Sequence, residues 1–341
     1  MSAEETAAPI GPAGPAEPTG PAEATRPAEP TESTVPTVKA YPSLLVIAGG
    51  TATGKTRLSL AVAAAVGGAE IISADSRQVY RGMDVGTAKV SAADRAHVPH
   101  HGLDLVDPNE LFTAADFQRH AHAVMPGIAA RGHWAILVGG TGLYLRSVAR
   151  GMPLDGADTD PAVRAELEGR LEREGLASLV AELRAIAPTL AANTHLANPR
   201  RVVRALERAR LVGDRLPEPP RGYPARTRWI GLRLPRAEQD ARIERRADDQ
   251  FAAGLVDEAV ALRARYGVHP RAFSAFGYFE ALAVADGEID LRTAIARDAG
   301  RTRAYARRQA TWFRSEPGIG WLEASHPEAA AIAAARQLVE S

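Results

Sequence analysis

Residues 49–56 read Gly-Gly-Thr-Ala-Thr-Gly-Lys-Thr, the G-x-x-x-x-G-K-T spacing of a phosphate-binding loop, or P-loop. An apolar run at 44–47 precedes it and an apolar-periodic segment from Leu58 follows it, which predicts strand, loop and helix. The glycines let backbone N–H groups converge on a phosphate, and the helix N-terminus adds partial positive charge. A chance match is the alternative, and the flanking strand and helix count against it. We expect a di- or triphosphate site formed by Gly49, Thr51, Ala52, Thr53, Gly54, Lys55 and Thr56, with Thr56 able to ligate Mg²⁺.

Two more polar residues follow predicted strands of the same region. Asp75 comes after the apolar run 69–74, and Thr141 follows two glycines after the run 135–138. Ligands of open α/β sheets bind at the carboxyl ends of the strands, so we expect both residues, and Asp107 with them, beside the P-loop. Asp75 could act as a base, ligate Mg²⁺ or cap a helix, and its position alone leaves these roles open. Thr141 could donate to a phosphate oxygen or belong to an ordinary turn.

One acidic residue is missing from this pattern. A P-loop NTPase ordinarily carries a strand that ends in Asp or Asp-Glu, which serves Mg²⁺ and the attacking water. The run 135–138 ends instead in Gly-Gly-Thr. This difference weakens the interpretation of the chain as an ATPase.

Arginine residues gather in the second half of the chain. Residues 200–246 contain fourteen Arg against six acidic residues, and residues 301–314 contain five Arg and no acidic residue, with aromatic residues between them. Arg200, Arg201 and Arg204 share one helical turn, and Arg242 and Arg246 lie on one helix face. A single cluster is more typical of a solvated helix face. Several clusters in a chain of zero net charge favour a polyanionic partner such as RNA.

Alternating strands and helices must position these residues. Apolar runs predict strands at 43–48, 69–74, 102–106, 135–138 and 229–234. Helical periodicity predicts helices after the P-loop and at 114–130, 236–266, 275–286 and 290–313. The alternation predicts an α/β fold of the P-loop NTPase type, with a doubly wound, mostly parallel sheet. Residues 155–213 show helical patterns only, at 161–174, 176–186 and 199–211, and predict an all-helical insertion domain.

Composition bounds the remaining segments. Residues 1–40 hold eight of the 24 prolines and six Glu, which predicts a disordered tail. The core would then comprise 41–154 and 214–330, with a helix end or tail at 331–341. The chain has no Cys, so disulfides and thiolate zinc sites are excluded. We expect structural roles for His97, His100 and His101 and core positions for Trp229, Trp312 and Trp321. No signal peptide and no apolar run of about 20 residues is evident, so we expect a cytoplasmic protein outside the membrane.

Several longer segments, taken in order, resemble the bacterial tRNA dimethylallyltransferases (tRNA isopentenyltransferases, the IPP transferase family). The most specific segment is 75–89, Asp-Ser-Arg-Gln-Val-Tyr-Arg-Gly-Met-Asp-Val-Gly-Thr-Ala-Lys. The other matching segments are the P-loop, Pro-His-His-Gly-Leu-Asp at 99–104, Thr-Ala-Ala-Asp-Phe at 113–117, Leu-Val-Gly-Gly-Thr-Gly-Leu-Tyr at 137–144, Asn-Pro-Arg-Arg at 198–201 and the Arg-rich segment 302–314. The likeness runs from about residue 43 to about residue 325.

The resemblance implies a reaction and a set of residues. The family transfers a dimethylallyl group from dimethylallyl diphosphate to N6 of adenosine-37, directly 3′ of the tRNA anticodon, and releases diphosphate. The P-loop and Arg246 would bind the diphosphate with Mg²⁺, Asp75 would be the catalytic base, and Thr141 would stabilise the leaving group. The helical insertion would grip the anticodon stem-loop. The residues implied to contact tRNA are Asp75, Ser76, Arg77, Gln78, Arg164, Arg200, Arg201, Val202, Val203 and Arg204.

Three alternatives stay open at this point. An adenylate prenyltransferase would use the same P-loop and Asp75, but a free nucleotide needs no Arg-rich insertion. A P-loop kinase or ATP-driven nucleic-acid-binding protein would need the missing strand-end acid, and a non-catalytic RNA-binding module would not need Lys55, Asp75 and Thr141 together. We expect a monomer. The chain departs from many family members at Gly50, which replaces Pro, and at 274–279, which lacks polar residues beside the Gly-Tyr pair.

Overall fold

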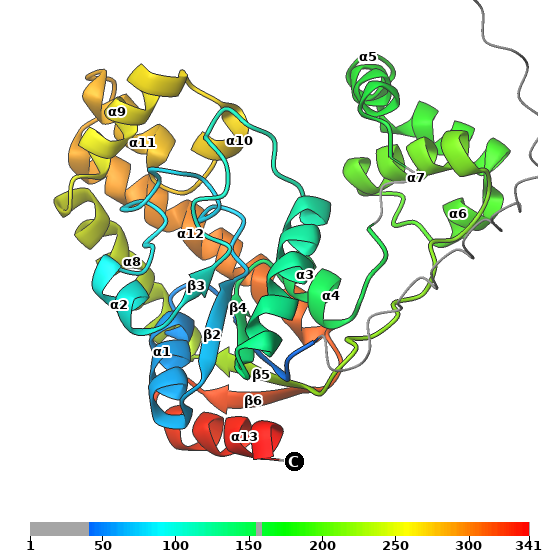
Figure 1. Cartoon of the computed structure of the whole chain (residues 1–341). Helices are drawn as coiled ribbons and strands as arrows, with labels where there is room; N and C mark the ends of the chain where they lie inside the picture. The colour runs from blue at the N-terminus through cyan, green and yellow to red at the C-terminus, as the bar shows by residue number, and fades with distance from the viewer. Residues whose placement is uncertain (1–40, 155–158, 341) are drawn as a thin grey trace, which may run out of the picture. The chain divides into compact units, whose positions relative to one another are not determined.

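A computed structural model describes residues 41–154 and 159–340, and the predicted N-terminal tail lies outside these ranges. Six strands form one sheet in the order β3-β2-β4-β1-β5-β6, and every neighbouring pair is parallel (Figure 1). The parallel sheet with helices between its strands confirms the predicted doubly wound α/β fold. The strands are β1 (Leu44–Gly49), β2 (Ala69–Ser73), β3 (His100–His101), β4 (Trp134–Gly139), β5 (Thr227–Arg233) and β6 (Ile319–Glu323).

The central strand β1 is buried on both faces. Leu44 and Val46 point into one hydrophobic cluster, and Leu45 and Ile47 into the other, because successive side chains of a strand alternate. Helices α3 (Ala114–Ala130), α4 (Gly142–Ala149) and α12 (Leu291–Arg314) pack on the first face. Helices α1 (Lys55–Val66) and α13 (Glu328–Glu340) pack on the second. Burial on both sides accounts for the uninterrupted apolar run of β1 in the sequence.

The register of the sheet brings three strand ends together. Ala48 of β1 pairs with Gly139 of β4, and Ser73 of β2 pairs with Val138 of β4. Since the three strands are parallel, β1, β2 and β4 end at one edge of the sheet. The P-loop, Asp75 and Thr141 follow these strands directly, so this edge carries the predicted site.

Residues with positive φ, in the left-handed region of backbone conformation, explain several differences between the predicted and the observed helices and strands. Gly254, at φ 96°, divides the predicted helix 236–266 into α8 (Arg236–Ala252) and α9 (Leu255–Tyr266). Gly277, at φ 86°, delays the predicted helix 275–286 to α11 (Tyr278–Ala285), which follows the short α10 (Pro270–Phe273). The predicted strand 102–106 is wrong, because Gly102 at φ 80° and Asp104 at φ 55° turn the chain after β3.

The described part of the predicted insertion, residues 159–213, contains helices and no strand. These are α5 (Pro161–Ile186), α6 (Pro188–Ala192) and α7 (Pro199–Val212), which pack around a hydrophobic cluster of their own. Asp160 and Asn198 cap α5 and α7, and a proline follows each cap. Gly175 interrupts α5 with non-helical angles, at the point where the two predicted helices meet.

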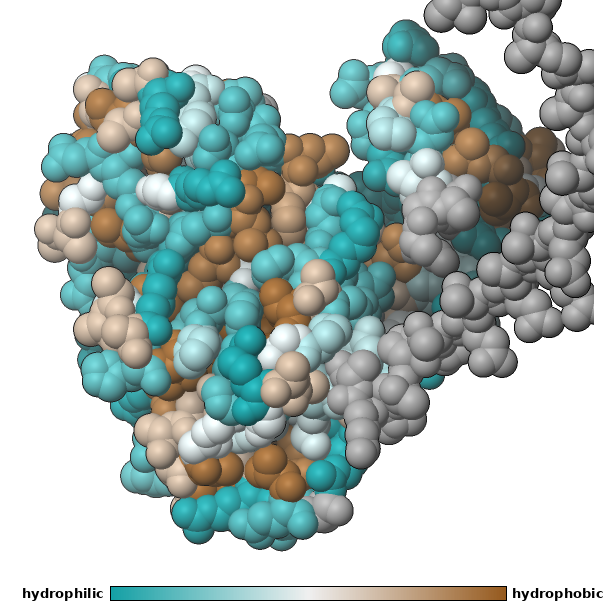
Figure 2. Space-filling view, viewed as in Figure 1, coloured by the Kyte–Doolittle hydropathy of each residue, from teal (hydrophilic) through white to brown (hydrophobic). Residues whose placement is uncertain are grey.

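Several elements were missed by the sequence patterns. They are α2 (Ala92–His97), α4, α6, α10, the edge strand β6 and the first turn of α13. Figure 2 shows hydrophilic residues spread over the visible elements, with hydrophobic residues between them. Of the helices that can be described, none is long and apolar enough to span a bilayer.

The turn after β3 provides a test of the fold. A Cβ on Gly102 would lie 2.5 Å from the Ser73 carbonyl oxygen, whereas a Cβ on Gly132, also at positive φ, would meet no atom within 4 Å. We expect Gly102→Ala to lower the free energy of unfolding by about 1–3 kcal/mol more than Gly132→Ala, because only the first adds a clash with backbone. Denaturant titration of both variants measures the difference. Equal losses would contradict this packing.

Candidate active site

The P-loop joins β1 to α1 through left-handed backbone. Gly54, at φ 89°, is the N-cap of α1, and Ala52 is held at φ 61°. The Thr53 hydroxyl and the Lys55 ammonium both donate to the Gly50 carbonyl oxygen, at 2.8 and 2.6 Å. The loop is therefore fixed by its own side chains, and Lys55 lies over it, where the predicted phosphate would bind.

A cavity of about 910 Å³ lies beside this loop. Its wall combines the P-loop, the turn after β2, the glycines after β4, residues 274–276, and side chains of α8 and α12. Gly49, Thr53 and Thr141 lie outside this lining, and Thr53 is buried. The structure thus brings the phosphate loop and the candidate base to one cavity. The predicted residues that line it are Thr51, Ala52, Gly54, Lys55, Thr56, Asp75, Ser76, Arg77, Gln78, Arg200 and Arg246.

Asp75 and Thr141 are connected through the turn at 76–79. Asp75 Oδ1 accepts from the Arg77 N–H at 2.8 Å, and Thr141 Oγ1 accepts from the Ser76 N–H at 3.1 Å. Because a turn and not a helix follows Asp75, the helix-cap alternative is wrong. Thr141 occupies the N-cap position of α4, but its hydroxyl holds the turn that carries Asp75. The threonine therefore positions the candidate base.

Burial makes the cations of this cavity less basic. Burial lowers the pKa of Lys55 to about 8, with a contribution from Arg246, while Asp75 opposes the shift. Burial also lowers the pKa of Arg246, and Asp75 and Asp298 oppose it. Two partly exposed cations and a carboxylate thus influence one another's pKa values at the cavity wall. A bound anion would favour the charged form of Lys55.

Two glutamines, to which no sequence motif assigns a role, hold the P-loop in place. Gln309 of α12 accepts from the Thr51 N–H at 2.8 Å and donates to the Gly140 carbonyl at 2.9 Å, so it bridges the ends of β1 and β4. Gln239 of α8 donates to the Thr51 carbonyl at 2.8 Å. Gln309 lies within the Arg-rich segment, and only its partners, distant in sequence, reveal its function.

The segment 84–89 forms a braced loop beside the cavity. Glu258 accepts from the backbone N–H groups of three successive residues, 84–86, and Gln250 donates to the carbonyls of Val85 and Gly86. Lys89 is buried between Asp84 and Asp104. The Gln78 side chain, predicted to contact tRNA, donates to the carbonyls of Thr87 and Ala88 and accepts from Ser73. Many residues of the motif at 75–89 therefore stabilise the conformation of this segment itself.

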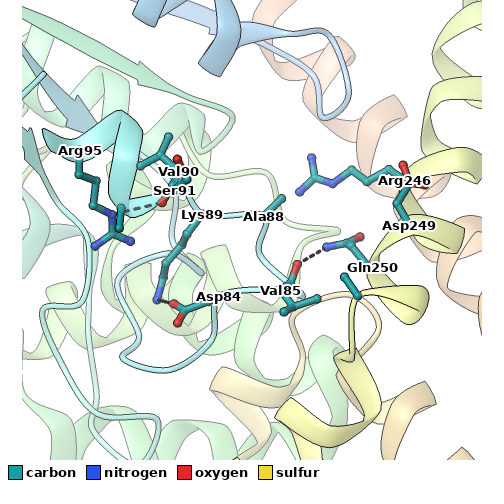
Figure 3. A pocket seen from close by; sticks show the side chains of 12 residues that line it. Asp84, Val85, Ala88, Lys89, Val90, Ser91, Arg95, Arg246, Asp249 and Gln250 are labelled. Carbon is teal, nitrogen blue, oxygen red and sulfur yellow. Dashed lines mark hydrogen bonds and ion pairs between the residues drawn. The ribbon is translucent and has the colours of Figure 1, made fainter. Parts of the chain in front are cut away.

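A second cavity, of about 670 Å³, is lined by residues of this loop and shares Ala88, Val90 and Arg246 with the first. Figure 3 shows Arg246 extending from α8 toward Ala88, with Gln250 bonded to Val85 and Lys89 paired with Asp84. Arg246 therefore stands at the boundary between the two cavities, and the P-loop lines the first of them.

The predicted tRNA residues of the helical insertion divide into three groups. Arg200 and Arg201 are exposed at the start of α7. Arg164 and Arg204 both contact Glu207, a fully buried carboxylate, at 2.7 and 3.0 Å. The side chains of Val202 and Val203 are buried in the helical core, so they pack the insertion and do not face a ligand. Arg164 and Arg204 thus share a structural partner, Glu207, that the sequence did not reveal.

Other candidates lie elsewhere. Asp107 pairs with Arg81 and stands outside the P-loop cavity, because the chain turns away from the sheet after β3. His101 pairs with the buried Glu70, while His100 lines the cavity. Across the part of the chain that can be described, no group of three or more His, Asp and Glu residues could hold a metal. Trp229 is buried, and Trp312 and Trp321 pack partly buried against the core.

Lys55 should make diphosphate binding depend on pH. The ammonium form attracts the anion, so affinity for inorganic diphosphate should fall as the pH rises through about 8. Lys55→Arg should lose this contribution, because a guanidinium stays charged. Isothermal titration calorimetry of both proteins, from about pH 7 to about pH 9.5, measures the effect, and the titration of diphosphate itself cancels between them. Identical pH profiles would rule out the proposed role of Lys55.

The comparisons with known proteins agree with this geometry. The family model described as IPP transferase matches residues 78–316. A protein named tRNA dimethylallyltransferase from Symbiobacterium thermophilum is 44% identical over 84% of this chain and 91% of its own length. A protein of the same name from Anaeromyxobacter sp. (strain K) is 47% identical over 83% of this chain and 93% of its own.

Solved structures show the same relationship. The full-length tRNA isopentenylpyrophosphate transferase of Bacillus halodurans is 38% identical, with a TM-score of 0.65, over 88% of this chain and 97% of that one. A eukaryotic dimethylallyltransferase described as acting on tRNA is 25% identical, with a TM-score of 0.72, over 86% of this chain and 77% of that one. This chain belongs to the IPP transferase family.

Proposed function

We propose that this protein transfers a dimethylallyl group from dimethylallyl diphosphate to N6 of adenosine-37, beside the anticodon of tRNA, and releases diphosphate. The observation that carries the proposal is the single cavity lined by both Lys55 of the P-loop and Asp75. A diphosphate donor and an acceptor amine that must lose a proton can meet there. The names of the relatives support the same activity.

The P-loop end of the cavity suits the leaving group. As the allylic C1–O bond breaks, its electron pair leaves with the diphosphate, whose charge the loop N–H groups, Lys55 and Arg246 would stabilise. Thr56, exposed at the cavity, offers the hydroxyl ligand for Mg²⁺, and phosphate oxygens and water would complete its shell. Bound Mg²⁺ would neutralise negative charge on the departing diphosphate.

The Asp75 end suits the acceptor. An exocyclic adenine amine is a weak nucleophile, so a base that takes its proton assists the attack. The N6 lone pair forms the new bond to C1, and the N6 proton passes to the Asp75 carboxylate. The Arg77 N–H fixes this carboxylate, and Thr141 fixes the turn that bears it. The adenine must leave the anticodon-loop stack to enter the cavity.

The remaining features favour tRNA over the alternative substrates. Gln309 bonds to Gly140 where an NTPase would carry its acidic strand end, which disfavours ATP hydrolysis. The exposed Arg200 and Arg201, at the start of α7, suit an RNA backbone that a free nucleotide lacks. Action as a monomer stays a prediction.

A transfer assay tests the proposal. Labelled dimethylallyl diphosphate with Mg²⁺ is offered to unmodified tRNA, to the same tRNA with guanosine in place of adenosine-37, and to AMP. We expect label in the unmodified tRNA only. Label in AMP alone would indicate an adenylate prenyltransferase, and ATP turnover without transfer would overturn the proposal.

Asp75→Asn should lower kcat by about 10²- to 10⁴-fold, because the amide cannot accept the N6 proton. Binding of the donor should change little, since Lys55 and the loop remain. The matched control is Asp107→Asn, which alters a carboxylate outside the cavity, and its kcat should stay within about two-fold of wild type. Single-turnover kinetics with saturating tRNA separate the chemical step from binding. A near-normal rate for Asp75→Asn would remove the assigned base.

A further inference from the structure

Two aromatic side chains form a surface within the cavity, and the proposed reaction assigns no role to either of them. Phe276, before α11, and Tyr305 of α12 both line the cavity and are partly exposed. Their ring centroids lie 5.1 Å apart with an interplanar angle of 46°. We call this pair the aromatic shelf. Phe276 lies in the segment where the chain departs from many family members, so the family pattern gave it no role.

Arginine guanidinium groups lie over both rings of the aromatic shelf. The Arg301 guanidinium carbon is 5.7 Å from the Phe276 ring centroid, and that of Arg308 is 5.6 Å from the Tyr305 centroid. Arg301 pairs at 2.6 Å with Glu280, whose side chain is almost fully buried. This carboxylate fixes the cation against the shelf, since an ion pair with a buried acid moves less freely than an exposed one.

Tyr305 also lies beside the catalytic groups. Burial and nearby Asp75 raise its pKa, whereas Arg77 and hydrogen bonds with Thr141 and Gln309 lower it. Tyr305 therefore lies within reach of the base-bearing turn and of the glutamine that holds the P-loop. An acceptor whose reactive nitrogen points at Asp75 would present its ring nearby.

We propose that the aromatic shelf stacks the flipped adenine and so positions its N6 for attack. Bases of single-stranded RNA are held by stacking on aromatic rings and on guanidinium planes, and the shelf offers both. This inference rests on the proposed function, because the adenine would enter the cavity as the acceptor of that reaction.

The dimethylallyl group is the competing occupant, and electrostatics disfavours it. Positive charge builds on the allylic carbon as the C1–O bond breaks. A ring face can stabilise such a cation, but here Arg301 and Arg308 already lie within the distance of a cation–π contact and would repel it. A purine carries no such charge, and its phosphates are attracted by the arginines.

A thermodynamic cycle tests the shelf without catalysis. The dissociation constant is measured, with no donor present, for two anticodon stem-loop RNAs, one with adenosine-37 and one with an abasic site there. We expect Phe276→Ala to weaken binding of the adenosine RNA by about ten-fold and to leave binding of the abasic RNA unchanged. Phe276→Tyr should restore the affinity. Phe279→Ala is the matched control, since Phe279 is an exposed aromatic residue outside the cavity.

Each outcome separates the inference from the proposed function. Equal losses for both RNAs, or no loss for either, would overturn the aromatic shelf while tRNA transfer by the wild type still stood. Wild-type protein that bound neither RNA would overturn the proposed function itself, and the shelf with it. Inorganic diphosphate should bind Phe276→Ala as it binds wild type, which shows that the variant keeps its fold.

Discussion

The parallel register of β2, β4 and β1 is the constraint on which the rest of the site depends. Pairing of Ser73 with Val138 and of Ala48 with Gly139 aligns the three strand ends. The P-loop, Asp75 and Thr141 can meet only because of this alignment. Gln309 of α12 connects the ends of β1 and β4, because its side chain forms hydrogen bonds with Thr51 and Gly140. A shift in any of these strands would separate the P-loop from Asp75, the proposed base.

Buried charge is the second organising feature of the molecule. Lys55 and Arg246 are held in a site that lowers their pKa values, so the protein without ligand keeps cations where they are costly. A bound anion would stabilise these cations, because its negative charge offsets the free-energy cost of partly burying them. Elsewhere, buried Glu207 and Glu280 hold arginines at the surface of the insertion and at the cavity wall. In both places an acidic residue determines where an arginine can point.

The local sequence predicted the parts of the structure that depend on local physics. The P-loop, the strand ends at Asp75 and Thr141, the helix 114–130 and the break at Gly175 follow from glycines, caps and periodicity. The prediction of the third strand was wrong because β3 has only two residues, His100–His101, which carry almost no periodic signal, and Gly102 turns the chain after them. Gln309, Glu258 and Glu207 could not be assigned, since their partners lie far away in the chain or inside another helix.

Donor binding tests the central claim most directly, because every proposed role assumes that the P-loop holds a prenyl diphosphate. Isothermal titration calorimetry with a non-reactive thiolo analogue of dimethylallyl diphosphate, in the presence of Mg²⁺, would be compared with ATP. We predict that the analogue binds more tightly than ATP, that Lys55→Ala abolishes its binding, and that ATP is not hydrolysed. Tighter binding of ATP together with its turnover would contradict a prenyl-diphosphate site and indicate that the protein hydrolyses ATP.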